Sequence, residues 1–469
     1  MNAVAEKSNR PGTFPMDALP APLSALCAAR PEMVVAALAV VAGAIGPSAQ
    51  IRRTSTQETF SANIFSIIRA EGGRPEWLAS LLAPINEYQQ HLLAGASWEA
   101  EEGELSALEA GIESNRRHFF RNDRFPDPAH MRYFDHRLRQ VGLRKRRIFH
   151  SENPAPGTIL SLFQQNPEQC MFLTWLDPRS FRDHCEFWDT AKGQKEGELI
   201  VRALSGGTFT QSRDDDISVL TQPSLNGIAV CDDGCLKRLI DAESELLRKA
   251  GLVLVVDGGA HAEMATLPSN REASYGCWRH LVRRLLDERF GLAPRVYSLS
   301  DGAEDALVAA HAAEFHGLWE KHGVPPHLAV ELCLQIMLVL HVCQERPADV
   351  IPDATALSAI QISRWALEEN YQVIQALRDE DMIESGRAAS MAMLEKIRRK
   401  GPVSRRDLFR SYDRQKRSPL VTILEELIGS GMVVEDPQGL LSVAAADEQA
   451  TQIFASEIAH CHTANTATP

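Results

Sequence analysis

The sequence lacks an excess of positive charge, a bilayer-length apolar run and a secretion signal. A net charge of -13 over 469 residues excludes a uniformly basic coat for nucleic acid, although clustered basic residues could still form local binding faces. The most apolar stretch, residues 33–46, is shorter than the roughly 20 residues that cross a bilayer, and it predicts a buried helix. Nine scattered cysteines fit a reduced compartment, so we expect a cytoplasmic protein without membrane contact.

The sequence also lacks internal repeats, a nucleophile elbow and a zinc-protease motif. Five residues have types that bind zinc: Cys231, Cys235, His261, Cys277 and His280. They lack the paired Cys-x-x-Cys spacing of structural zinc sites, so we expect no metal there. His341 ends a strongly apolar stretch and is expected to be a core or capping histidine.

Hydrophobic residues make up 44% of the chain, enough for a large core and two or more domains. Short apolar runs separated by helical patterns predict a buried, mostly parallel sheet and hence an α/β fold. The predicted strands are residues 62–70, 170–176, 217–221, 225–231 and 251–259.

Changes in composition divide the chain into predicted regions. They are a loose N-terminus (1–13), N-terminal helices (14–56), an α/β core (57–299) with a helical and basic insertion at about 84–150, a wholly helical region (300–385), a winged helix (388–445) and a loose tail (446–469).

Residues 388–445 have the pattern of a winged helix, three helices followed by a hairpin. Ser404 is the expected N-cap of the second helix, and Gly431 is expected to end the third. The third helix, which would read the bases, contains Glu425 and Glu426 and lacks Arg, Asn and Gln. Contact with a nucleic-acid backbone and docking of a protein therefore both stay open. The basic residues of this unit assigned to nucleic acid are Lys396, Arg398, Arg399, Lys400, Arg405, Arg406 and Arg410.

A second basic segment, residues 116–147, holds eleven Arg and Lys against three Asp, with aromatic residues between them. Basic side chains neutralise phosphates while aromatic rings stack on bases, the combination expected for a single-strand path. A surface helix whose arginines pair with the acidic block at residues 98–113 explains the same pattern. The residues assigned to DNA or RNA are Arg116, Arg117, Arg121, Arg144, Lys145, Arg146 and Arg147.

The stretch RAEGGRPEWLASLL, residues 69–82, joins an apolar strand to a helix through a glycine turn. This is the outline of a phosphate-binding loop, which should supply a lysine for the phosphates and a Ser or Thr for magnesium.

Several stretches, in order, resemble the family called domain of unknown function 3987. Its members look like RecA-like P-loop proteins of prophages and other mobile elements, found near replication genes. The matching stretches are FPMDALP, AEGG followed by LLAPI, RALSGGTFTQSRDDDISVLTQPSLNGIAV and QIMLVLH, within residues 14–375. The resemblance implies a RecA-like P-loop core with a mostly parallel sheet.

In the family's loop pattern, the lysine position falls on Glu76 and the hydroxyl position on Trp77. Glu76 would repel phosphate, and Trp77 offers magnesium no oxygen ligand. The remnant of the loop would be Gly72, Gly73 and Arg74.

Two further positions differ from the family pattern. Asp177 is followed by Pro178 where a glutamate is usual, and Gln335 stands where an arginine is usual. The loss of several charged groups predicts that the fold is kept while ATP hydrolysis is lost.

We therefore expect a degenerate ATPase that needs no cofactor and serves as a nucleic-acid-associated accessory or assembly subunit in a mobile-element replication system. A protein partner is expected, and an oligomer is compatible with the family. One alternative is an active DNA-dependent ATPase or helicase that uses ATP and Mg²⁺. Another is a protein-interaction scaffold that does not bind nucleic acid.

Overall fold

A computed structural model describes the main elements of the chain. The residues it describes are 14–27, 30–70, 74–93, 106–107, 110–114, 117, 148–166, 168–213, 216–220, 222–241, 253–257, 271–291, 294–322, 325–345, 347–410 and 417–443. The chain divides into two compact units, residues 1–374 and 375–469, and the boundary falls within one long helix.

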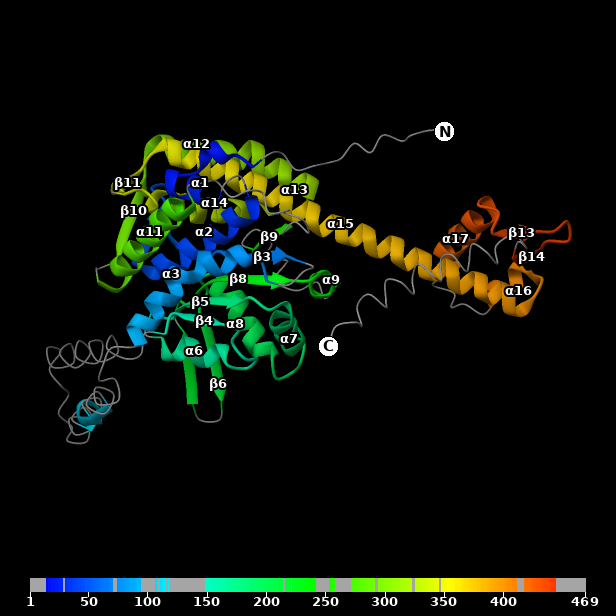
Figure 1. Ribbon diagram of the computed structural model, residues 1–469, viewed down its shortest axis with the longest axis horizontal. Helices are drawn as coiled ribbons and strands as arrows, with labels where there is room; N and C mark the ends of the chain where they lie inside the picture. The colour runs from blue at the N-terminus through cyan, green and yellow to red at the C-terminus, as the bar shows by residue number, and fades with distance from the viewer. Residues whose placement is uncertain are drawn as a thin grey trace. The chain divides into compact units, whose positions relative to one another are not determined.

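A five-stranded parallel sheet forms the centre of the first unit (Figure 1). Its strands, in spatial order, are β4 (His150–Glu152), β5 (Cys170–Trp175), β8 (Ser224–Cys231), β3 (Phe65–Arg69) and β9 (Val253–Asp257). The residues of β5 and β8 are all buried, because helices cover both faces of the sheet. The predicted parallel sheet is therefore confirmed.

Helices pack on both faces of this sheet (Figure 1). On one face lies α2 (Pro31–Ile45), which contacts β8, β3 and β9 and in turn packs against α11 (Arg271–Gly291). On the other face lie α7 (Pro178–Trp188) and α8 (Gln194–Leu204). Residues 31–48 are long and apolar enough to cross a membrane, but 78% of this window is buried, so α2 is the core helix that the sequence predicts.

Further helices belong to the same part of the chain. They are η1 (Met16–Ala18), α1 (Ala21–Cys27), η2 (Gly46–Ser48), α3 (Glu76–Leu93), α6 (Ile159–Gln165) and α9 (Asp233–Asp241).

One predicted strand of the main sheet pairs elsewhere. β7 (Asp216–Leu220) forms an antiparallel hairpin with β6 (Phe209–Arg213) rather than joining the parallel strands. An apolar run indicates extended structure, but it does not indicate the partner strand.

A second sheet contains two strands in regions for which the sequence predicts only helices. Its strands, in spatial order, are β11 (Val350–Ile351), β10 (Arg295–Leu299), β1 (Ala49–Arg52) and β2 (Thr59–Ser61). β1 lies within the predicted N-terminal helices, and β11 interrupts the region predicted to be wholly helical. Strands of two to four residues are too short to give a periodic signal.

The helices between β10 and the end of the first unit agree better with the sequence. They are α12 (Asp301–Ala310), a π-helical turn η3 (His311–Phe315), α13 (His316–His322), α14 (Pro326–Val342) and the first part of α15 (Asp353–Lys400). His341 is fully buried in α14, where its Nε2 lies 2.8 Å from the Ala348 carbonyl oxygen, so the predicted core histidine is confirmed.

The second unit follows the predicted order of helices and hairpin. After the end of α15 come β12 (Val403–Ser404), α16 (Arg405–Arg410), α17 (Arg417–Gly429), β13 (Val433–Glu435) and β14 (Leu440–Val443). The Asp407 N–H donates to Ser404 Oγ at 3.2 Å, which confirms the predicted cap. Gly431 has a φ of +77° just after α17, the left-handed backbone that favours glycine at a helix end.

Candidate phosphate edge and basic surfaces

The position predicted for a phosphate loop lies at the carboxyl edge of the main sheet. At this edge β3 ends at Arg69, β8 at Cys231, β5 at Trp175 and β4 at Glu152. In parallel α/β sheets, ligands bind at the carboxyl edge, where the loops that follow several strands come together. The charged groups at this edge therefore decide what it can bind.

Two arginines at this edge are paired with consecutive aspartates. Arg69 Nε and a terminal nitrogen donate to the two carboxylate oxygens of Asp233, at 2.6 and 2.8 Å. Arg182, in α7, forms an ion pair with Asp232. Asp232 joins β8 to α9 and Asp233 is the first residue of α9, so carboxylates of the protein itself pair with both arginines.

The described arginine of the loop remnant is also paired with a carboxylate. Arg74 lies 3.6 Å from the carboxylate of Glu152 at the end of β4. Glu76 is the first residue of α3 and is exposed, so it places a negative charge at the helix end that would otherwise attract phosphate. Trp77 is partly buried against the core. Gly72 and Gly73 lie outside the described residues.

Asp177 has a structural role. Its carboxylate accepts a hydrogen bond from the Arg179 N–H at 3.0 Å and caps α7, while Pro178 takes the first helical position. The N–H of Leu176 donates to Asn153 Oδ1 at 2.9 Å, which fixes the end of β5. The aspartate and proline are thus explained by the start of a helix.

Gln335 is not brought together with the loop. It is buried in α14, and its Oε1 accepts a hydrogen bond from the Asn63 N–H at 3.3 Å. Asn63 precedes β3, whereas Ala70 follows it, and seven extended residues span roughly 23 Å. Gln335 therefore lies toward the amino edge of the sheet.

Four residues that close the edge are not predicted from the sequence: Arg69, Arg182, Asp232 and Asp233. The local signal is the acidic pair in CDDGC directly after a buried strand. The partner arginines are 50 and 164 residues away, so no local pattern reveals these pairs.

Of the basic segment at residues 116–147, the structure describes only Arg117. This side chain is exposed and lies 3.3 Å from Glu113, one helical turn away. The pairing is of the kind expected if the arginines neutralise the preceding acidic block. The other residues assigned there lie outside the described residues: Arg116, Arg121, Arg144, Lys145, Arg146 and Arg147.

The basic residues of the second unit differ in how they are paired. Arg405 binds both Glu435, at 2.6 Å, and Glu425, and these two contacts raise the pKa of its guanidinium. Five others lie exposed on the end of α15 and on α16: Arg398, Arg399, Lys400, Arg406 and Arg410. Three of these five, Arg398, Arg399 and Arg410, have a carboxylate within 4.0 Å. Lys396 is half-buried, and its pKa is lowered by burial and by Lys400.

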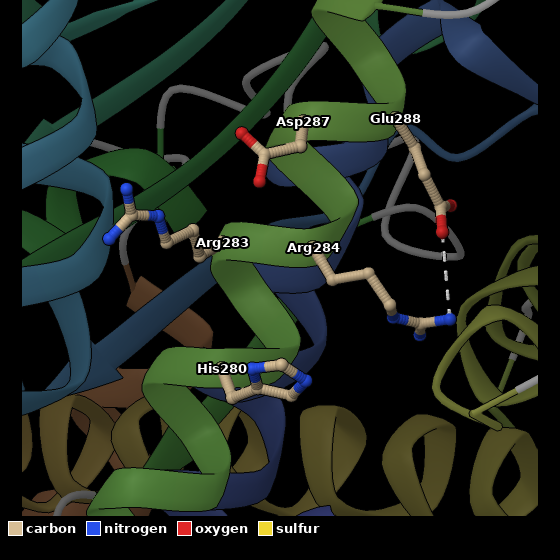
Figure 2. Close-up of a pocket in the computed structure, with 5 residues that line it drawn as sticks. All are labelled: His280, Arg283, Arg284, Asp287 and Glu288. Atoms are coloured by element: carbon tan, nitrogen blue, oxygen red, sulfur yellow. Dashed lines mark ion pairs between the residues drawn. The ribbon is translucent and has the colours of Figure 1, made fainter.

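An open cavity of about 570 Å³ lies on α11, but its charges cancel. It is lined by His280, Arg283, Arg284, Asp287 and Glu288. Figure 2 shows that these side chains diverge from one helix face, with an ion pair of 3.6 Å between Arg284 and Glu288. Because two arginines and two carboxylates line the cavity, it favours neither anions nor cations.

The zinc-type residues do not form a metal site within the described part of the chain. No group of three or more His, Cys, Asp or Glu side chains there is arranged to hold a metal ion. Cys231 and Cys235 are buried, Cys277 is exposed on α11, and His261 lies outside the described residues.

Comparison with known proteins finds no family model and no curated protein that matches this chain. The resemblance described above therefore stays a prediction, and the function must be argued from the site.

Proposed function

We propose that this chain is a cytoplasmic RecA-like P-loop protein, of the mobile-element family it resembles, whose ATP site no longer works. The strand order supports the fold. Numbered along the chain, the strands from β4 to β9 read 2-3-4-1-5, the order that RecA-like P-loop cores share. β3, which would lead into the phosphate loop, lies inside the sheet between β8 and β9.

The observation that carries the loss of hydrolysis is the occupation of the phosphate edge by carboxylates. Asp233 and Asp232 pair with Arg69 and Arg182, and Glu76 begins the helix that follows the loop. Phosphoryl transfer needs positioned positive charge and a metal ion at the phosphates. Arg69, Arg74 and Arg182 at this edge are already paired with carboxylates and do not supply this charge, so no cofactor is required for the proposed role.

A role in nucleic-acid binding is supported by the exposed cations of the second unit. They lie on the end of α15 and on α16 and suit contact with phosphate backbones. The proposed protein is an accessory or assembly subunit of a replication-type system, bound to DNA or RNA and to a protein partner.

Thermal unfolding of the full-length protein with ATP, ADP and Mg²⁺ tests the loss of the ATP site. We expect no change in the unfolding midpoint at millimolar nucleotide, because only ligands that bind the folded state raise it. A clear rise would support the alternative of a working DNA-dependent ATPase or helicase.

Fluorescence anisotropy with labelled single- and double-stranded DNA and RNA tests nucleic-acid binding. We expect the triple variant R398E/R399E/K400E to bind at least about tenfold more weakly and to flatten the salt dependence, because each lost phosphate contact removes counterion release. The matched control R279E/R283E reverses two exposed arginines of α11 and should bind like the wild type.

A second candidate, a protein-docking scaffold, is favoured by the surface of α17. Its exposed side includes Val421, Glu425 and Glu426, a combination that suits a protein rather than a base pair. Binding that is absent, or insensitive to both salt and the triple charge reversal, would support this candidate instead.

A further inference from the structure

Three cysteine thiols meet beside the carboxyl edge of the main sheet. Cys185 lies in α7, Cys231 is the last residue of β8, and Cys235 lies in the first turn of α9. Cys235 Sγ is hydrogen-bonded to Cys185 Sγ at 4.0 Å, and Cys231 Sγ donates to the carbonyl oxygen of Asp232 at 3.4 Å. Residues separated by 46 and 50 positions thus form one buried cluster.

The three thiols differ in acidity. Hydrogen bonds from Cys185 and Cys231 lower the pKa of Cys235 to about 5, although burial acts in the opposite direction. The same contact and burial raise the pKa of Cys185. The nearby Arg182 also favours the Cys235 thiolate. These opposite directions favour the thiolate at Cys235 and the thiol at Cys185, the roles of an attacking and a resolving cysteine.

We propose that Cys185 and Cys235 form a dithiol that a small peroxide oxidises to a disulfide. The Cys235 thiolate attacks one oxygen of hydrogen peroxide, an S–O bond forms, the O–O bond breaks, and the leaving hydroxide takes a proton to become water. The Cys185 sulfur then attacks the resulting sulfenic acid, an S–S bond forms, and a second water leaves with the Cys185 proton. Each sulfur loses one electron, and the peroxide gains two.

The pairing of Cys235 with Cys185 rather than Cys231 follows from the elements that carry them. A bond between Cys185 and Cys235 would join α7 to α9, two elements whose residues already contact each other. The cluster is a poor metal site, because contact with Cys235 and burial raise the pKa values of Cys185 and Cys231. No group of three or more His, Cys, Asp or Glu side chains among the described residues is arranged to hold a metal ion.

Oxidation would act on the edge that the ion pairs close. Arg182 precedes Cys185 by one helical turn, and its partner Asp232 lies between Cys231 and Cys235 in the sequence. A covalent link between α7 and α9 would therefore hold the Arg182–Asp232 pair in place. The inference depends only on the thiol cluster and does not require the proposed function.

The test treats reduced, full-length protein with about one equivalent of hydrogen peroxide. Thiols are then counted under denaturing conditions, and disulfide-linked peptides are mapped by mass spectrometry without reductant. We expect the nine thiols to fall to seven, a single crosslink between Cys185 and Cys235, and a return to nine after reduction.

Three variants complete the test. C185S and C235S should each lose the crosslink, whereas C277S, which removes an exposed thiol on α11, should keep it. Nine unreacted thiols, oxidation confined to Cys277, or a crosslink between Cys231 and Cys235 would each overturn the proposal. If a variant does not fold, the crosslink map of the wild-type protein still decides.

Discussion

At the scale of single residues, Arg69 and Asp233 form a bidentate ion pair that is partly buried. Their side chains are 14% and 27% exposed, and two nearly parallel hydrogen bonds join them. A partly buried bidentate pair loses more when one partner is neutralised than an exposed pair does, because the remaining charge stays desolvated.

We expect D233N to lower the free energy of unfolding by roughly 1–3 kcal/mol, because Arg69 would keep its charge while it loses the ionised partner of two hydrogen bonds. Urea denaturation measures the change. The matched control is E87Q, which removes the partner of Arg279 in a pair whose side chains are 55% and 60% exposed. The control should change stability by no more than about 0.5 kcal/mol, and equal effects of the two variants would contradict the role of burial.

Buried histidines make stability depend on pH. Burial lowers the pKa of His150 to about 4 from its ordinary value of 6.5, and burial also lowers the pKa of His184 and His341. Below about pH 6.5 these histidines bind protons in the unfolded chain more readily than in the folded chain, where their pKa values are lower. The stability present above pH 6.5 is therefore lost as the pH falls toward 4.

For His150 alone, this loss amounts to about 3 kcal/mol across that range. The variant H150Q should show a shallower fall in unfolding free energy between pH 7 and 4.5, whatever its stability at neutral pH. Denaturant titrations at several pH values measure the slope. H280Q, which changes an exposed histidine of α11, should keep the wild-type slope; a wild-type slope in H150Q would refute the assignment.

At the scale of elements, the contact between α2 and β5 depends on a missing side chain. A Cβ atom at Gly43 would lie 2.6 Å from the ring of Phe172, so the helix can lie this close to the strand only with glycine there. The close approach explains why an Ala- and Gly-rich helix occupies the centre of the core.

We therefore expect G43A to destabilise the protein by about 1–3 kcal/mol through overpacking. The control is G276A in α11, where a Cβ would meet no atom within 4 Å. That substitution should be neutral or stabilising, because alanine favours a helix by about 1 kcal/mol over glycine. Urea denaturation of both variants decides, and a neutral G43A would mean that α2 moves away without cost.

At the scale of the whole molecule, the two units have separate cores. The core of the second unit consists of Met393, Ile397, Val403, Leu408, Leu424, Leu427, Val433 and Leu441. The large core of the first unit is built around α2, α14 and the sheets. Separate cores predict separate cooperative unfolding.

Hydrogen exchange measured by mass spectrometry tests this independence. L424A should remove roughly 2–5 kcal/mol from the second unit and speed amide exchange in residues 389–443, while exchange in β3, β5 and β8 stays unchanged. L285A, a matched truncation in the core of the first unit, should show the reverse pattern. Faster exchange in both units of either variant would indicate a single cooperative structure.

The sequence by itself determined the local features of this protein. Continuous apolar runs located β3, β5, β8 and β9, because a strand buried on both faces needs apolar residues at every position. Ser404 and Gly431 marked helix ends, since caps depend on one side chain or one backbone angle. The short loop motif likewise showed that Glu76 and Trp77 stand where a phosphate-binding loop has a lysine and a hydroxyl residue.

Only the tertiary structure decided which distant residues meet. It paired β7 with β6, built a second sheet from strands of two to five residues, and placed Gln335 toward the opposite end of β3 from the loop. It also brought Asp232 and Asp233 to the edge arginines and gathered three cysteines into one cluster. Such contacts arise from packing between elements far apart along the chain, and no local pattern of residues records them.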